Sequence, residues 1–143
     1  MRTTLFAAAL AVALAHPAWT SAREELPQIK VHSQMGVPYV SGGADDLNRK
    51  ALRRISDQYP LQLVFSKEGS DAPVTGVKVT LRDIKGNPIV EAVSEGPLFF
   101  LNPPGGRWTI EAELDGQVLT HTVDLMGRQY QQVKLKFGGT QQQ

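Results

Sequence analysis

The chain has 143 residues, a formal net charge of +1 at neutral pH and no cysteine. This length suffices for one domain with its own hydrophobic core. Without cysteine the chain forms no disulfide, thiolate nucleophile or zinc–sulfur site, and we expect no lipid anchor on cysteine. The near-zero charge argues against general nucleic-acid or anionic-membrane binding, which needs an excess of positive charge.

Residues 1–22 are predicted to be a secretory signal peptide. Arg2 supplies an early positive charge, residues 5–15 form an apolar run, and small residues follow up to Ala22. The run is too short to span a bilayer, which takes about 20 residues. A buried N-terminal helix is the weaker alternative. Cleavage is expected after Ala22, or else after Ala18, leaving a formally neutral chain that we expect to be periplasmic or secreted, without membrane insertion after processing.

Residues 23–43 are predicted to form an extended arm. This segment holds two prolines and three glycines and shows only weak alternation. We therefore expect at most one short strand in it, around residues 29–32. At the other end of the chain, residues 138–143 are predicted to be a disordered tail.

Residues 44–59 are predicted to form the only convincing helix. Apolar side chains recur there at helical spacing, at Leu47, Ala51, Leu52, Ile55 and Tyr59. Asp45 and Asp46 lie where an N-cap and the helix dipole favour carboxylates. Pro60 is expected to end the helix, because it disfavours the α conformation in the residue before it.

The polar face of this helix is strongly basic. It carries Arg49, Lys50, Arg53 and Arg54. Asp46 and Asp57 lie three or four residues from these cations and are expected to pair with them. The face is therefore predicted to be a solvated, internally compensated surface rather than a site for membranes or nucleic acids.

From residue 61 onward, apolar and polar residues alternate as they do in half-buried strands. Turn signals separate seven predicted strands, at residues 61–66, 77–82, 89–95, 98–102, 107–114, 118–125 and 129–137. The side chains predicted to face inward on two of these strands are Val77, Val79 and Leu81, and Trp108, Ile110, Ala112 and Leu114. Asp115 and Gly116 are predicted to form a tight hairpin turn.

The stretch "VTGVKVTLRDIKGNPIVEAVSEGPLFFLNPPGGRWTIEAELDGQ" carries a family likeness. It resembles the carboxypeptidase-regulatory-like, or transthyretin-like, β-sandwich, whose members read V-x-V-x-L-x-D-x-x-G and then L-x-P-G-x-Y/W-x-I/V. The resemblance covers residues 61–137, and residues 60–137 are assigned to this domain. It implies a mainly β, seven-stranded antiparallel Greek-key sandwich of transthyretin- or immunoglobulin-like type, with one N-terminal amphipathic helix. Small exported bacterial proteins with this domain are similar, and starch-binding-like modules belong to the wider class.

The segment "NPPGG", residues 102–106, is interpreted as a corner between two strands. Proline fixes φ and lacks a donor for the ladder, while glycine tolerates the conformations of a sharp reversal. The corner is expected to deliver Trp108 into the core. A ligand-binding loop is the alternative, but a phosphate-binding loop would need a helix after it, and a strand follows here.

The residues that could carry catalysis form no convincing set. His32 and His121 are 89 positions apart, in the arm and in a strand, and are interpreted as structural. Glu111 and Glu113 share a strand face with Cα atoms about 6.6 Å apart. A glycosidase pair faces a cleft with one buried carboxyl group, whereas these two point away from the Trp108 face. No catalytic, cofactor-binding or metal-binding residue is therefore predicted.

The predicted ligand-binding residues are Tyr130, Tyr39 and Gln132, because sugar binding needs exposed rings with polar neighbours. Tyr130 is out of phase with the inward residues of its strand and is expected to face solvent beside Gln132. Phe99 and Phe100 are consecutive, so one of them must leave the core unless the helix covers the second face of their sheet.

These observations predict an exported, non-enzymatic binding or accessory protein of the cell envelope, with no cofactor. We expect a protein or another envelope component as partner, recognised through sheet edges and loops. A carbohydrate-binding module, with a glycan as ligand, is the alternative. The transthyretin-like fold also hosts hydroxyisourate hydrolases, which depend on histidine and arginine clusters and a C-terminal Tyr-Arg-Gly-Ser. The ending "KLKFGGTQQQ" departs from that pattern.

Overall fold

The computed structural model describes residues 11–12, 25–127 and 129–138. The predicted signal peptide, apart from residues 11–12, and residues 139–143 of the predicted tail lie outside the described residues. In the described part of the chain, no helix is long and apolar enough to cross a membrane.

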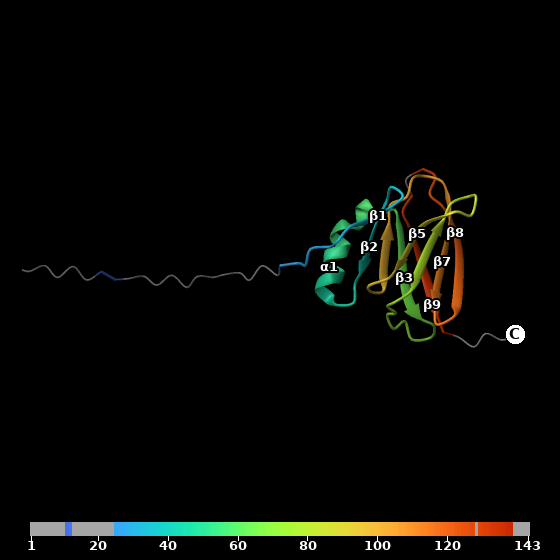
Figure 1. Ribbon diagram of the computed structural model, residues 1–143. Helices are drawn as coiled ribbons and strands as arrows, with labels where there is room; N and C mark the ends of the chain where they lie inside the picture. Colours follow the sequence, from blue (N-terminus) through green and yellow to red (C-terminus); the bar gives the residue numbers. More distant parts are fainter. Residues whose placement is uncertain (1–10, 13–24, 128, 139–143) are drawn as a thin grey trace, which may run out of the picture.

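The described residues form two β-sheets and one α-helix (Figure 1). The elements in chain order are β1 (His32–Gln34), β2 (Val37–Gly42), α1 (Asp46–Ile55), the 3₁₀ helix η1 (Ser56–Gln58), β3 (Leu61–Lys67), β4 (Lys78–Arg82), β5 (Pro88–Val93), β6 (Leu98–Leu101), β7 (Arg107–Leu114), β8 (Gln117–Asp124) and β9 (Gln131–Phe137). One sheet has the order β1-β2-β6-β3-β9 and the other β5-β4-β7-β8. The mainly β prediction is confirmed, with nine strands in the described residues instead of seven.

The seven predicted strands correspond to β3–β9, and the two additional strands lie in the predicted arm. Met35 and Gly36, with φ values of 46° and 79°, turn β1 back onto β2, and β2 pairs with β6. The prediction of an extended arm is therefore wrong for this part of residues 23–43. The pattern failed to show β2 because both faces of that strand are covered. Tyr39 packs into the main core and Val40 packs under α1, so β2 lacks the alternation of a half-exposed strand.

The prediction of a fully antiparallel sandwich is also wrong, because β9 pairs with β3 in parallel, from Leu61 opposite Gln131 to Lys67 opposite Phe137. After β8, which belongs to the four-stranded sheet, the chain crosses to the five-stranded sheet, where β9 is an edge strand. The alternation of a single strand does not show which sheet that strand joins, or in which direction it runs.

The main core lies between the inner faces of the two sheets. Val77, Val79, Leu81, Ile110 and Ala112 are buried in one cluster with residues of β3, β6 and β9. Trp108 and Leu114 are half-buried and pack against the same cluster. Both sets of side chains therefore face the core, as predicted. They do not meet across two stacked layers, because β4 and β7 are paired neighbours in the same sheet.

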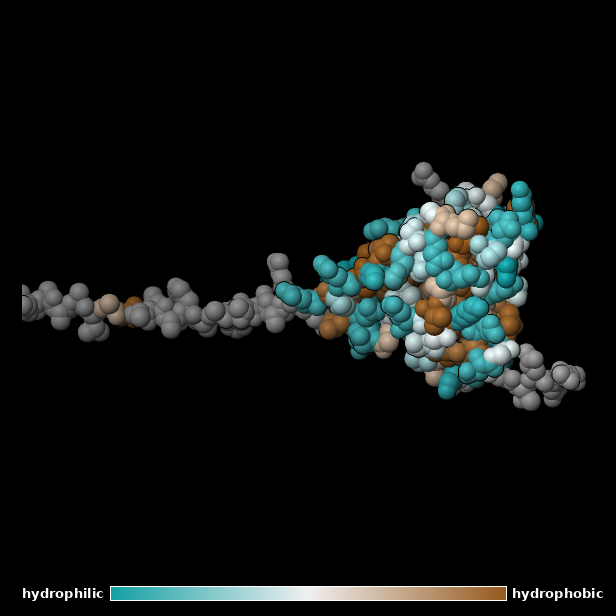
Figure 2. Space-filling view, in the orientation of Figure 1, coloured by the Kyte–Doolittle hydropathy of each residue, from teal (hydrophilic) through white to brown (hydrophobic). Residues whose placement is uncertain are grey.

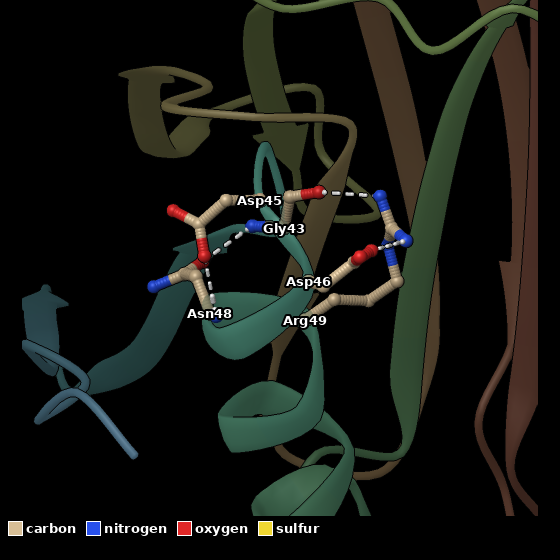
Figure 3. A network of polar contacts seen from close by, with 5 residues as sticks. All are labelled: Gly43, Asp45, Asp46, Asn48 and Arg49. Atoms are coloured by element: carbon tan, nitrogen blue, oxygen red, sulfur yellow. Dashed lines mark hydrogen bonds and ion pairs between the residues drawn. The ribbon is translucent and has the colours of Figure 1, made fainter. Parts of the chain in front are cut away.

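The N-terminus of α1 is tied to the end of β2 by a polar network (Figure 3). Asp45 is the N-cap, as predicted, and accepts the backbone N–H of Asn48 at 2.8 Å. The Asn48 side chain accepts the backbone N–H of Gly43. Arg49 pairs with Asp46 at 2.9 Å and donates to the carbonyl of Gly43 at 3.3 Å. These contacts connect the first turn of α1 directly to the residue that follows β2.

α1 packs on the outer face of two strands of the five-stranded sheet, β2 and β6. Leu52 and Tyr59 pack on Val40 and Phe100, which belong to β2 and β6. Phe99, the neighbour of Phe100, faces the main core, so both phenylalanines are buried, and the helix provides the cover that the second face of β6 needs. The helix is shorter than predicted, because a 3₁₀ turn follows Ile55, and Leu47 is partly exposed rather than buried.

Candidate functional site

An apolar hollow of about 580 Å³ lies at one end of the sandwich. Three loops surround it, β4–β5, β6–β7 and β8–β9, which lie at the upper end of the two sheets in Figure 1. Ile84, Trp108 and Met126 are its large apolar residues, one from each of these loops or from the strand that follows it. We call this the loop-end hollow.

Two of these residues expose most of their surface although they are apolar. Ile84 is 80% exposed and Met126 is 69% exposed. Single exposed apolar residues are ordinary on protein surfaces, but two that line one hollow beside a tryptophan are typical of an interaction site. The loop-end hollow is therefore the best candidate site in the described part of the chain.

The two loop tips that carry Ile84 and Met126 have the same kind of turn. In each, an aspartate side chain accepts hydrogen bonds from backbone N–H groups of residues that follow it. Asp83 Oδ1 accepts the N–H groups of Lys85 and Asn87, both at 2.9 Å. Asp124 Oδ1 accepts the N–H of Met126 at 3.0 Å. These bonds fix the loops before any partner arrives, which lowers the entropy lost on binding.

Trp108 and the proline–glycine segment form the third wall. The indole N–H of Trp108 donates to the carbonyl of Pro104 at 2.9 Å, and the N–H of Leu125 donates to the carbonyl of Gly106 at 2.8 Å. Residues 102–106 therefore form the predicted corner between β6 and β7. The same corner also lines the hollow, through Gly105 and Gly106. The interpretation as a corner between strands and the alternative of a ligand-binding loop are therefore compatible.

The pKa of the Asp83 carboxyl is lowered, chiefly because the Asn87 backbone N–H donates to its ionised form, with further donation from the Asn87 side chain and the Lys85 N–H. Asp83→Ala is therefore expected to destabilise the fold at neutral pH. The stabilisation by ionised Asp83 is complete above the ordinary pKa of aspartate, near 3.9, and is lost as the pH falls through the lowered pKa of the folded protein. Urea midpoints of wild type and variant should converge in acid, whereas a constant difference would contradict this assignment.

The structure separates the three predicted ligand-binding residues. Tyr130 is exposed, as expected, and its hydroxyl donates to the carbonyl of Asp57. Gln132 is exposed on β9 and does not line the loop-end hollow. Tyr39 is only 7% exposed and is stacked between His32 and Phe99, so it is not the exposed ring that the predicted role in sugar binding requires. Its burial follows from the pairing of β2 with β6.

The two histidines considered for catalysis lie in different sheets, His32 in β1 and His121 in β8. His32 stacks on Tyr39, with ring centroids 5.3 Å apart, and His121 is exposed on β8 rather than partly buried. Glu111 is held by Arg82 at 3.0 Å. Among the described residues there is no group of three His, Cys, Asp or Glu side chains that could hold a metal ion.

Ile84 and Met126 were not predicted as site residues. Each lies in a turn, in "DIKGN" and "DLMG", where polar residues are usual. A large apolar side chain one or two residues after a turn-forming aspartate is the signal that could have identified them. No protein-family model matches this chain, and no curated protein sequence gives a match to it.

Proposed function

We propose that this chain is an exported, non-enzymatic binding protein of the cell envelope, and that it holds a protein partner at the loop-end hollow. The observation that carries the proposal is the pair of exposed apolar side chains, Ile84 and Met126, on loops fixed by Asp83 and Asp124. Export is proposed from the sequence of residues 1–22 alone.

A protein partner suits the hollow better than a small polar ligand does. Its wall is mainly apolar, and methionine adapts its shape to the side chains that it meets. Arg107, Asp83 and Asp124 provide charged groups at the same site, as is usual around the apolar centre of an interface. The visible face of the molecule is otherwise largely hydrophilic, with hydrophobic residues in separate patches (Figure 2).

The proposal is tested by capture from a cell-envelope extract of the source organism, with the purified protein as bait. The double variant Ile84→Ser/Met126→Ser should lose the partner, with binding at least about tenfold weaker, because truncating the central apolar residues of an interface removes most of its affinity. Surface positions are affected by less than about 0.5 kcal/mol, so the fold should be unchanged.

The matched control is Met35→Ser/Val93→Ser, which removes a methionine and an aliphatic residue that are 76% and 61% exposed and do not line the hollow. This control should capture the partner as wild type does. Equal capture by both double variants would contradict the proposal.

A carbohydrate-binding role is the second candidate, favoured by exposed Tyr130 just before β9 and exposed Gln132 at the start of that strand. In affinity electrophoresis through polysaccharide gels, retardation that is lost in Tyr130→Ala would favour it. Retardation that survives in that variant, or none at all, would argue against it and leave the protein partner as the proposal.

A further inference from the structure

A second hollow, of about 410 Å³, lies on the outer face of the five-stranded sheet. α1 covers β2 and β6 there but leaves β3 uncovered. The hollow extends along β3 from Gln62, which is paired with Gln132, to Ser66, which is bridged to Pro73. We call it the α1–β3 groove. It is separate from the loop-end hollow, with which it shares no lining residue.

The floor of the groove is apolar and one side of it is cationic. Val64, Leu98 and Phe100 supply the apolar surface, and Arg49 and Arg53 line it from the helix. Strand geometry makes the segment from residue 62 to residue 66 about 13 Å long, which suits an alkyl chain of about eight to ten carbons. Pockets of this volume hold small molecules.

The positive charge beside the floor is only partly compensated. Arg49 pairs with Asp46 at 2.9 Å. The predicted pairing of Asp57 with the basic residues near the end of α1 is wrong for Arg53, which has no ion pair within the described residues, because the chain leaves the α-helix after Ile55.

Two lysines of β9 lie in register with β3 but do not line the groove themselves. Lys134 is beside Val64 and has no ion pair to a described residue. Lys136 is beside Ser66 and pairs with Asp71 at 3.3 Å. Asp71 is the only carboxylate that lines the groove in the described part of the chain, and this lysine neutralises it. An anion in the groove would therefore meet net positive charge, supplied chiefly by Arg53.

We propose that the α1–β3 groove binds a small amphiphilic carboxylate, with its carboxylate on Arg53 and its alkyl chain over Val64, Leu98 and Phe100. The planar guanidinium donates two parallel hydrogen bonds to a carboxylate, which a lysine cannot match. The alkyl chain removes the partly exposed Val64 and Leu98 from water. The proposal does not depend on the function proposed for the loop-end hollow.

The test is a titration of the full chain with octanoate, followed residue by residue in ¹H–¹⁵N NMR spectra. Octanoate should saturate with a Kd below about 1 mM, and the shifts should be confined to the groove. Acetate, which lacks the chain, and octan-1-ol, which lacks the charge, should bind at least about tenfold more weakly. Octanol binding as tightly as octanoate would overturn the proposal.

Two variants on α1 provide a matched pair. Arg53→Gln should weaken octanoate binding by about tenfold or more, because a charge-assisted contact is lost. Arg54→Gln removes the same charge from the next residue, which does not line the groove, and should bind octanoate as wild type does. Equal affinity of the two variants would overturn the proposal, as would shifts centred on Ile84 and Met126.

Two further binding experiments distinguish the carboxylate from other anionic amphiphiles. If octyl phosphate bound more tightly than octanoate, the preferred ligand would be a phosphate ester rather than a carboxylate. The proposed ligand class would then be wrong. Binding to vesicles of anionic phospholipid, without saturable binding of octanoate, would assign the groove to a membrane surface and overturn the proposal as well. Saturable octanoate binding that is lost in Val64→Ser and Arg53→Gln supports the proposal.

Discussion

Gly96→Ala is expected to lower the free energy of unfolding by about 3 kcal/mol, the upper range for overpacking a tightly packed site. A Cβ on this buried residue would lie 2.2 Å from the carbonyl oxygen of Gly42 and 2.4 Å from its carbonyl carbon. Both are backbone atoms, so the β5–β6 connection and the end of β2 would have to separate. The separation would also disturb Ala44, whose N lies 3.0 Å from that Cβ, just before α1. Thermal unfolding should show a Tm lower by roughly 10 °C.

Gly105→Ala is the matched control. Neither glycine has a positive φ, and a Cβ at Gly105 would meet only the carbonyl oxygen of Leu125, at 3.5 Å. This variant should keep the wild-type stability or gain up to about 1 kcal/mol, because alanine restricts the unfolded chain more than glycine does. If both variants unfold at the wild-type temperature, the close approach of Gly96 to Gly42 is not a feature of the folded protein.

Phe99→Ala is expected to cost about 3–5 kcal/mol, the range for truncating a buried phenylalanine. Phe99 is fully buried at the centre of the main core and stacks on Tyr39, with ring centroids 5.4 Å apart. The loss combines the transfer free energy of the removed ring with the cavity that it leaves. Urea unfolding, read as the change in midpoint at constant slope, measures it.

Two comparisons distinguish loss of core packing from a general weakening of the strands. Phe99→Leu keeps most of the volume and should cost about 1.5 kcal/mol or less. Val93→Ala, at a 61% exposed position of β5, should change stability by less than about 0.5 kcal/mol. Equal losses for Phe99→Ala and Val93→Ala would mean that Phe99 does not lie between the sheets.

Most of the fold could be predicted because one face of most strands is buried and the other is solvated. The alternation of Val77, Val79 and Leu81 follows directly from this arrangement. β2 could not be recognised, since both of its faces are covered and its turn is made by Met35, a residue that rarely takes a positive φ. The parallel pairing of β9 depends on which sheet the strand joins, and the local sequence pattern does not encode this.

The candidate site was harder to predict than the fold, because it consists of loops. Burial explains Trp108, which was expected in the core and does pack against it. Nothing in the local pattern shows that Ile84 and Met126 line the same hollow, since they are 42 positions apart along the chain. Their proximity depends on the pairing of β4 with β7 and of β7 with β8.

In-cell photo-crosslinking at the rim of the loop-end hollow tests the proposed binding role most directly. A photoreactive amino acid placed at position 84 should give a discrete crosslinked protein species, and the same amino acid at position 93, also exposed but outside the hollow, should not. A crosslink found at 84 and absent at 93 is the predicted result. No crosslinked species at position 84, or the same species from both positions, would contradict the assignment of this hollow as the partner-binding surface.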